Sequence, residues 1–190
     1  MLRSTYRKEA HDWSADGRFI LYMETSQQTG GDLWVLPMEG ERKPWVWLNT
    51  PAFETQARFS PDGKWIAYQS DESGPYEIYL QAFVTGAPAS GGKRQLSTNG
   101  GWVPFWRRDG RELFYLTASG KLMAVEITPG AELKAGAPKE LFAPSGSRVS
   151  TERGYTVTGD GQRFLFVTSA EDASVPPFTV VLNWMAEMKK

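Results

Sequence analysis

The sequence predicts an all-β protein built from four copies of one unit, each a small antiparallel sheet of the kind that forms a β-propeller blade. Three observations lead to this prediction. Asp-Gly dipeptides recur at positions 16–17, 62–63, 109–110 and 160–161, at offsets of 46, 47 and 51 residues. Runs of β-branched and aromatic residues follow each dipeptide. Nowhere do apolar residues recur at helical spacing over a long stretch without an intervening Gly or Pro.

Each unit is expected to begin with a strand that ends at its Asp-Gly turn, where glycine supplies the positive φ that a tight hairpin needs. Second strands are predicted at 19–22, 65–68, 113–116 and 164–167, third strands at 33–36, 77–80, 122–125 and 178–181, and fourth strands at 45–48, 94–96 and 140–142. Many of these positions are apolar on both sides of the strand, which suits sheets covered on both faces, as stacked blades are.

The ends of the chain complete the predicted architecture. The fourth unit has no fourth strand, and the stretch Arg3–Arg7 would supply that edge if the two ends of the chain join. The tail Met185–Lys190 is the one helical candidate and is expected to fray. We therefore expect a single propeller segment over residues 1–190. Its four blades of four-stranded antiparallel sheets are predicted at about residues 11–50, 55–97, 103–143 and 154–184.

Charge and composition exclude several classes of function. The chain has 21 basic and 22 acidic side chains, so its formal charge of -1 provides no net field for nucleic acid or an anionic membrane. The cluster of Arg107, Arg108 and Arg111 is expected to be a solvated hairpin tip. With no cysteine there is no disulfide, zinc ribbon or thiol nucleophile. No signal peptide or membrane segment is expected in these residues, and the compartment stays open.

Candidate catalytic and metal-binding residues are few. The single histidine, His11, precedes Asp12, but no Gly-x-Ser-x-Gly motif accompanies it, and Ser90-Gly91-Gly92-Lys93 lacks the partner motifs of a Ser-x-x-Lys enzyme. The acidic pairs Asp71-Glu72 and Glu171-Asp172 would suit calcium or an acid and base couple, yet neither belongs to an Asp-x-Asp-x-Asp-Gly loop. We therefore predict no catalytic residue, no metal site and no cofactor.

The repeat predicts which loops share a face. Connections from second to third strand and between blades should emerge on one face, which collects acidic side chains and Trp102; the Asp-Gly turns and the connections from third to fourth strand should emerge on the other. The acidic face would also carry Glu24 and Asp32, and its predicted ligand-binding residues are Glu54, Asp71, Glu72, Trp102, Glu171 and Asp172. The opposite, basic face would carry Arg18, Arg42, Lys43, Lys64, Lys93, Arg107, Arg108, Arg111 and Lys139.

Three stretches carry a family resemblance. "FSPDGKWIAYQSDESGPYEIYLQAF", "GGKRQLSTNGGWVPFWRRDGRELFYLTASGKLMAVEI" and "PPFTVVLNW" resemble the TolB-like, WD40-like propeller repeats of bacterial proteins, among them the ectodomains of membrane-anchored serine/threonine kinases. The resemblance implies a propeller in a periplasmic or extracytoplasmic setting. It also implies six or more blades, whereas this chain holds four, so we expect a partial or short propeller that exposes blade faces for a homo-oligomer.

These observations favour a non-enzymatic propeller module that presents a protein- or ligand-interaction surface, as part of a bacterial sensor or envelope protein. The alternative is an enzyme. It would be an esterase, lactonase or peptidase with its site in the propeller mouth, or the propeller half of a protein like the prolyl oligopeptidases. A third interpretation is purely structural, with blade faces that serve in assembly. Fold alone does not decide among them.

Overall fold

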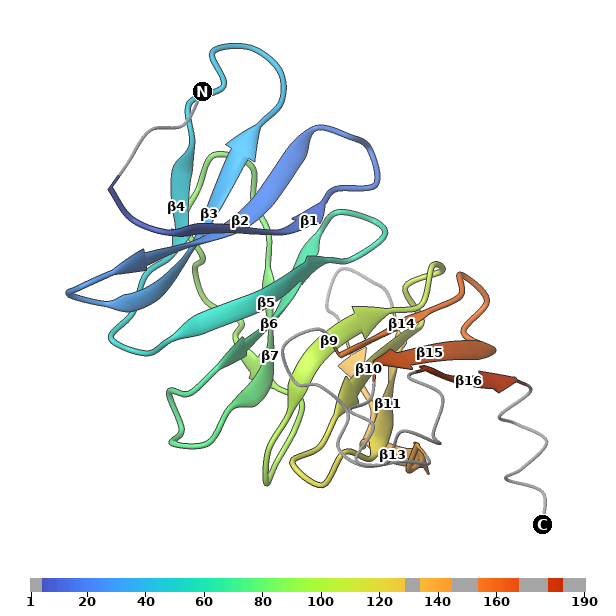
Figure 1. The fold of residues 1–190 in the computed structure, drawn as a ribbon. Helices are drawn as coiled ribbons and strands as arrows, with labels where there is room; N and C mark the ends of the chain where they lie inside the picture. The colour runs from blue at the N-terminus through green and yellow to red at the C-terminus, as the bar shows by residue number, and fades with distance from the viewer. Residues whose placement is uncertain (1–4, 129–133, 145–153, 168–177, 183–190) are drawn as a thin grey trace. The chain divides into compact units, whose positions relative to one another are not determined.

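The computed structural model describes residues 5–128, 134–144, 154–167 and 178–182, and this part of the chain is all β (Figure 1). Its strands form four antiparallel sheets that follow one another along the sequence. The chain divides into two compact units, residues 1–98 and 99–190, with two sheets in each. The predicted fold class, a partial propeller of blade-like sheets, is confirmed.

The first unit holds two four-stranded sheets whose strands pair in chain order. The first sheet consists of β1 (Lys8–Trp13), β2 (Phe19–Ser26), β3 (Gly30–Pro37) and β4 (Trp45–Leu48). The second sheet consists of β5 (Glu54–Phe59), β6 (Trp65–Ser70), β7 (Glu77–Ala82) and β8 (Arg94–Gln95).

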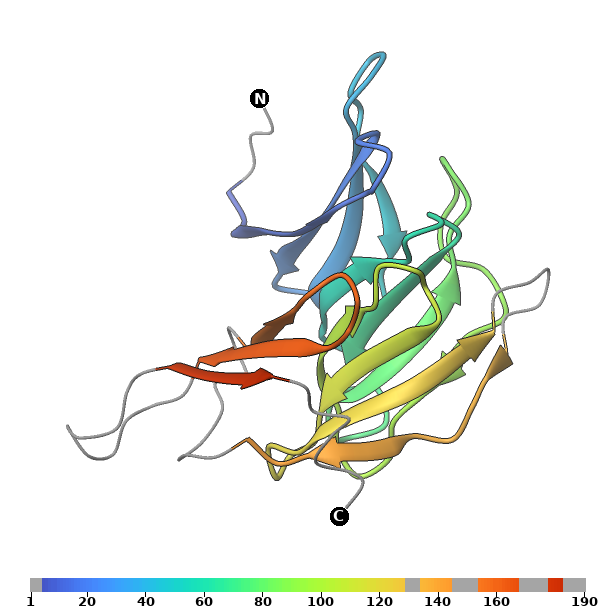
Figure 2. The same cartoon turned by 90° about the vertical axis from the view of Figure 1, so that its right-hand side faces the viewer.

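The second unit differs from the predicted pattern in its first sheet (Figure 2). This third sheet consists of β9 (Trp102–Trp106), β10 (Glu112–Leu116), β11 (Leu122–Thr128), β12 (Lys134–Ala135) and β13 (Lys139–Phe142). It has five strands because β11 is long enough to pair with β13 through its first residues and with β12 through Ile127 and Thr128. The fourth sheet consists of β14 (Tyr155–Val157), β15 (Arg163–Val167) and β16 (Phe178–Leu182).

The repeated Asp-Gly turns connect first to second strands as predicted. Their glycines, Gly17, Gly63, Gly110 and Gly161, have φ of 76°, 68°, 73° and 73°. In the first turn the Ser14 hydroxyl donates to Asp16 at 2.6 Å and accepts the backbone N–H of Phe19 at 2.9 Å. Ser60 makes the same two bonds in the second turn. A short hydroxyl residue two positions before Asp therefore closes these hairpins.

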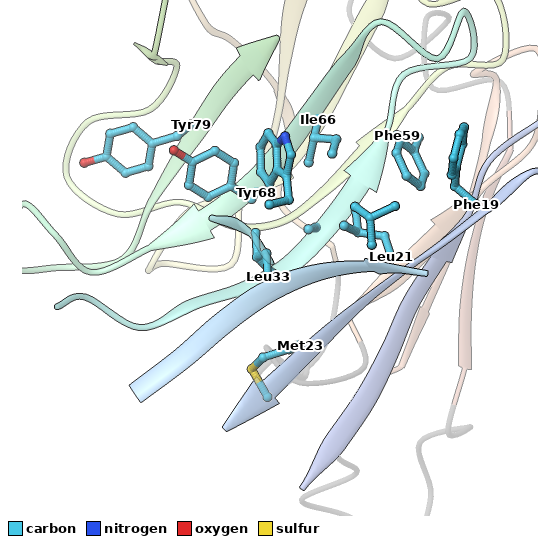
Figure 3. Close-up of a cluster of buried hydrophobic side chains, with 11 residues drawn as sticks. Phe19, Leu21, Met23, Leu33, Phe59, Ile66, Tyr68 and Tyr79 are labelled. Carbon is cyan, nitrogen blue, oxygen red and sulfur yellow. The ribbon is translucent and has the colours of Figure 1, made fainter. Parts of the chain in front are cut away.

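A mixed aromatic and aliphatic core holds the two sheets of the first unit together (Figure 3). Leu21 of β2 and Leu33 of β3 are fully buried and pack in one cluster with Ile66 and Tyr68 of the second sheet. At Gly31 a Cβ atom would lie 2.9 Å from both Met23 and Phe53, so only glycine permits this approach of β3 to the connection before β5. The start of β3 thereby lies close against the residues that lead into β5.

The core of the second unit includes several pairs of aromatic rings. Phe114 of β10 and Phe164 of β15 are buried and meet edge to face, with 5.1 Å between ring centroids. Phe166 is fully buried and stacks with Tyr155 at 5.5 Å. Each such pair adds to the free energy gained from burial.

The expectations for the chain ends have different outcomes. The carbonyl of Arg7 accepts a hydrogen bond from the backbone N–H of Thr25 at 3.0 Å, so Arg7 lies beside β2 of the first sheet, while residues 3–4 of the predicted edge lie outside the described residues. The other end, Met185–Lys190, lies outside the described residues. No helix in the part of the chain that the structure describes could span a membrane.

Candidate functional site

Three loops of the first unit meet at one end of its two sheets. They are the β2–β3 turn, the β4–β5 connection and the β6–β7 turn, and we call this region the acidic end; it includes Asp32, Glu54, Asp71 and Glu72. Gly31 approaches the backbone of Glu54, and the backbone N–H of Phe53 donates to Asp71 at 2.7 Å. The structure therefore brings together three of the predicted ligand-binding residues, Glu54, Asp71 and Glu72.

Glu54 is the most enclosed of these carboxylates. It is the first residue of β5 and has no exposed surface. The hydroxyl of Thr50 donates to Oε1, whereas Oε2 has no hydrogen-bond partner among the described residues. A buried oxygen without a partner costs free energy, so this carboxyl favours a protonated state or a nearby positive charge.

Asp32 repeats this arrangement on the neighbouring sheet. Only 4% of it is exposed, and Thr29 donates to its Oδ2 at 2.8 Å. Its Oδ1 is buried with no hydrogen-bond partner in the described part of the chain. Two enclosed carboxyls, each with a threonine hydroxyl on one oxygen, thus lie at the acidic end.

The electrostatics follow from burial and like charge. Burial raises the pKa of Glu54 to about 7, and the charges of Asp32 and Glu72 contribute to this increase. Burial also raises the pKa of Asp32, and the charge of Glu24 adds to the effect. A cation bound at this end would lower both pKa values, and near neutral pH it would displace a proton from Glu54.

Glu72 already has a positive partner. Its Oε2 lies 2.6 Å from Nζ of Lys93, although the order of loops along the repeat predicts that these two residues lie on opposite faces. That assignment is wrong for this pair because the Lys93 side chain lies over the Tyr79 ring, with Nζ 5.5 Å from the ring centroid, and so reaches the β6–β7 turn.

The other predicted residues have separate outcomes. Trp102 begins β9 in the second unit and is half-buried, and its indole ring covers Gly100, where a Cβ would be 2.6 Å from the ring. Glu171 and Asp172 lie outside the described residues. Glu24 lies within β2, not in a loop, and pairs with Lys8 at 2.6 Å.

One arginine of the basic cluster in the third repeat, Arg107, is paired with two carboxylates. Arg107 holds Asp109 through two bonds of 2.7 and 2.8 Å and Glu112 through a third of 2.6 Å. These partners also raise its pKa. Arg107 thus takes the place that a hydroxyl residue has in the first two turns.

His11 has a structural environment. Its Nδ1 accepts the backbone N–H of Ala57 at 3.2 Å, and burial together with the charge of Arg58 lowers its pKa to about 4. Asp12 accepts the N–H of Phe59 at 2.8 Å. Within the described ranges no three His, Cys, Asp or Glu residues form a group that could hold a metal ion.

The order of strands and loops along the repeat is enough to predict that Glu54, Asp71 and Glu72 share one face. The threonine partners Thr29 and Thr50 and the position of Tyr79 beside Glu72 are not predicted by it. No motif marks these three residues, because their positions depend on how the two sheets pack.

Comparisons with solved structures identify propeller proteins as similar. An oligogalacturonate lyase in complex with manganese aligns with a TM-score of 0.65 at 15% identity, over 97% of this chain and 53% of the lyase chain. A candidate 6-phosphogluconolactonase from Bacteroides uniformis aligns with a TM-score of 0.60 at 17% identity, over 92% of this chain and 50% of that one. A candidate TolB from Agrobacterium tumefaciens aligns with a TM-score of 0.55 at 17% identity, over 94% and 77%.

The chain has the fold of the TolB-like β-propellers. It spans about half the length of the lyase and of the Bacteroides protein. No family model matches the chain, and no curated protein matches it. At these identities the TolB-like fold is shared, and the activities named for the neighbours remain theirs.

Proposed function

We propose that this TolB-like propeller segment is a non-enzymatic binding module that takes a positively charged group of a protein or small ligand at its acidic end. The observation that carries the proposal is Glu54, a fully buried carboxyl with one unpartnered oxygen and a pKa of about 7. Its environment disfavours the ionised form, and a cation nearby relieves that penalty.

The surrounding residues support a binding role. Asp32 and Glu72 add negative charge, and Asp71 holds two of the three loops together through the N–H of Phe53. Such prearranged loops on a rigid sheet scaffold are common places for recognition. The TolB-like resemblance supports a setting in a bacterial sensor or envelope protein.

An enzymatic function has less support from the described residues. Two of the similar propellers are named as a lyase and a candidate lactonase. In this chain, however, the one histidine is buried, hydrogen-bonded to the backbone of β5 and neutral above about pH 4. A general base works best when its pKa lies near the operating pH, and the pKa of His11 lies well below neutrality.

The test uses an acetylated and amidated penta-lysine peptide as the cationic probe, with penta-glutamine as its neutral match. Isothermal titration calorimetry should detect penta-lysine binding that tightens between about pH 6 and about pH 8, because binding displaces a proton from Glu54. Glu54→Gln should retain the fold and lose this pH dependence.

Glu140→Gln is the matched control, since Glu140 is an exposed carboxylate of the second unit paired with Lys121 at 2.8 Å. It should behave as wild type. The proposal fails if penta-lysine does not bind, or if Glu54→Gln and Glu140→Gln have equal effects. Hydrolysis or elimination of an oligogalacturonate or a sugar lactone by the purified chain would favour the enzymatic alternative.

A further inference from the structure

Lys93 places a primary ammonium against a carboxylate and an aromatic ring. Its Nζ is 2.6 Å from Oε2 of Glu72 and 5.5 Å from the centroid of Tyr79. An anion combined with the face of an aromatic ring is a recurrent way to recognise organic cations. The two groups thus form a cation subsite, and in this structure a side chain of the same protein occupies it.

The ring of this subsite is held in a fixed position. The Tyr79 hydroxyl donates to Ser73 Oγ at 3.0 Å, and the ring stacks with Tyr68 at 5.8 Å between centroids. Tyr79 is only 3% exposed while Lys93 lies against it. Removal of the lysine side chain would therefore uncover a preformed surface.

The Lys93 side chain can leave Glu72 and Tyr79 at little cost. The strand that follows, β8, has only two residues, and both are exposed. Lys93 itself keeps 41% of its side chain exposed, and ion pairs of this kind are weak.

Glu72 also connects this subsite to the acidic end, because its charge contributes to the raised pKa of Glu54. We propose that Lys93 is an internal competitor that occupies the Glu72–Tyr79 subsite until a lysine or other primary ammonium of a protein partner displaces it. This inference rests on the proposed function, since it assigns the partner's chemical class and a regulatory contact to the same acidic end.

The experiment compares Lys93→Ala with Lys121→Ala, using the penta-lysine probe and calorimetry at about pH 7.5 and at about 0.1 M salt. Lys121 is a matched control because its Nζ also pairs with one exposed glutamate, Glu140, at 2.8 Å. Lys93→Ala should tighten penta-lysine binding by about three- to ten-fold, whereas Lys121→Ala should leave it unchanged. Circular dichroism confirms that each variant is folded.

A double variant separates the subsite from a general gain in negative charge. Adding Glu72→Gln to Lys93→Ala should return the affinity to the wild-type value or below it. If wild type binds penta-lysine and Lys93→Ala binds no more tightly, the inference about Lys93 is wrong and the proposed function stands. If neither wild type nor Lys93→Ala binds the probe, both are wrong.

Discussion

His11 of β1 accepts a hydrogen bond from the backbone N–H of Ala57 in β5, with 3.2 Å between Nδ1 and the amide nitrogen. Arg58 donates in return to the carbonyl of His11 at 2.6 Å. These bonds join the first strands of two consecutive sheets, which belong to different hydrogen-bonded ladders. The only histidine of the chain, in its neutral form, therefore links the two sheets through hydrogen bonds.

The first prediction concerns acid stability and His11. Its folded-state pKa is about 4, below the ordinary value of 6.5, so the unfolded chain takes up a proton first as the pH falls. The contribution of His11 to the free energy of unfolding is fully present above about pH 6.5. It decreases by up to about 3 kcal/mol as the pH falls toward 4. Urea unfolding at about pH 7 and about pH 5 should show this loss as a difference between wild type and His11→Asn, because Glu54 titrates with the opposite sign in both proteins. His11→Asn keeps an acceptor but does not titrate at this position; equal changes in stability between the two pH values in both proteins would contradict the assignment.

The second prediction has the opposite sign and concerns Glu54. Its folded-state pKa is about 7, above the ordinary 4.5, so the penalty for ionising it in the folded protein develops as the pH rises between these values. Glu54→Gln should therefore be more stable than wild type at about pH 8, by up to about 3 kcal/mol, and nearly equal to it at about pH 4. Glu140→Gln should change little at either pH, because Glu140 is exposed and paired with Lys121. A destabilised Glu54→Gln protein at about pH 8 would show that the ionised carboxylate is favoured in the fold.

Much of the fold could be predicted because the Asp-Gly spacing and the apolar runs are local signals. The predicted fourth strand at 45–48 coincides with β4, and the predicted second and third strands lie within or match the observed ones. The short β12 could not be predicted, since its two residues pair only because β11 extends to Thr128. The ion pair between Lys93 and Glu72 also could not be predicted from the order of the loops, because a long side chain can reach between faces that backbone topology keeps apart.

The third prediction tests the turn glycines. Gly110 has φ of 73°, where a Cβ is strained, whereas Gly136 has an ordinary φ and room for a Cβ 3.6 Å from Glu126. Gly110→Ala should lower the free energy of unfolding by about 1–2 kcal/mol. Gly136→Ala in the same unit should be neutral or slightly stabilising, because it reduces the entropy of the unfolded chain. Chemical denaturation of both variants checks the difference, and equal stabilities would exclude backbone strain as the cause.

The fourth prediction concerns a bulge that the sequence did not reveal. In β5 the pairing with β6 shifts between Thr55 and Arg58, and Gln56 within the shift has φ of 52°. A side chain in this region costs about 1–2 kcal/mol of strain, which glycine avoids, while glycine in a strand costs about 0.5–1 kcal/mol in entropy.

Gln56→Gly should therefore be neutral or stabilising by up to about 1 kcal/mol. Thr55→Gly, one residue earlier at an ordinary φ, should be destabilising by about 1 kcal/mol, since it loses a β-branched strand residue and gains no relief. Thermal and urea unfolding of the two variants measure the contrast. Equal destabilisation by both would mean that the side chain of Gln56 contributes more to the fold than its backbone strain costs. If Thr55→Gly were more stable than Gln56→Gly, the strain would lie at Thr55, whose φ is ordinary, and the prediction would be contradicted.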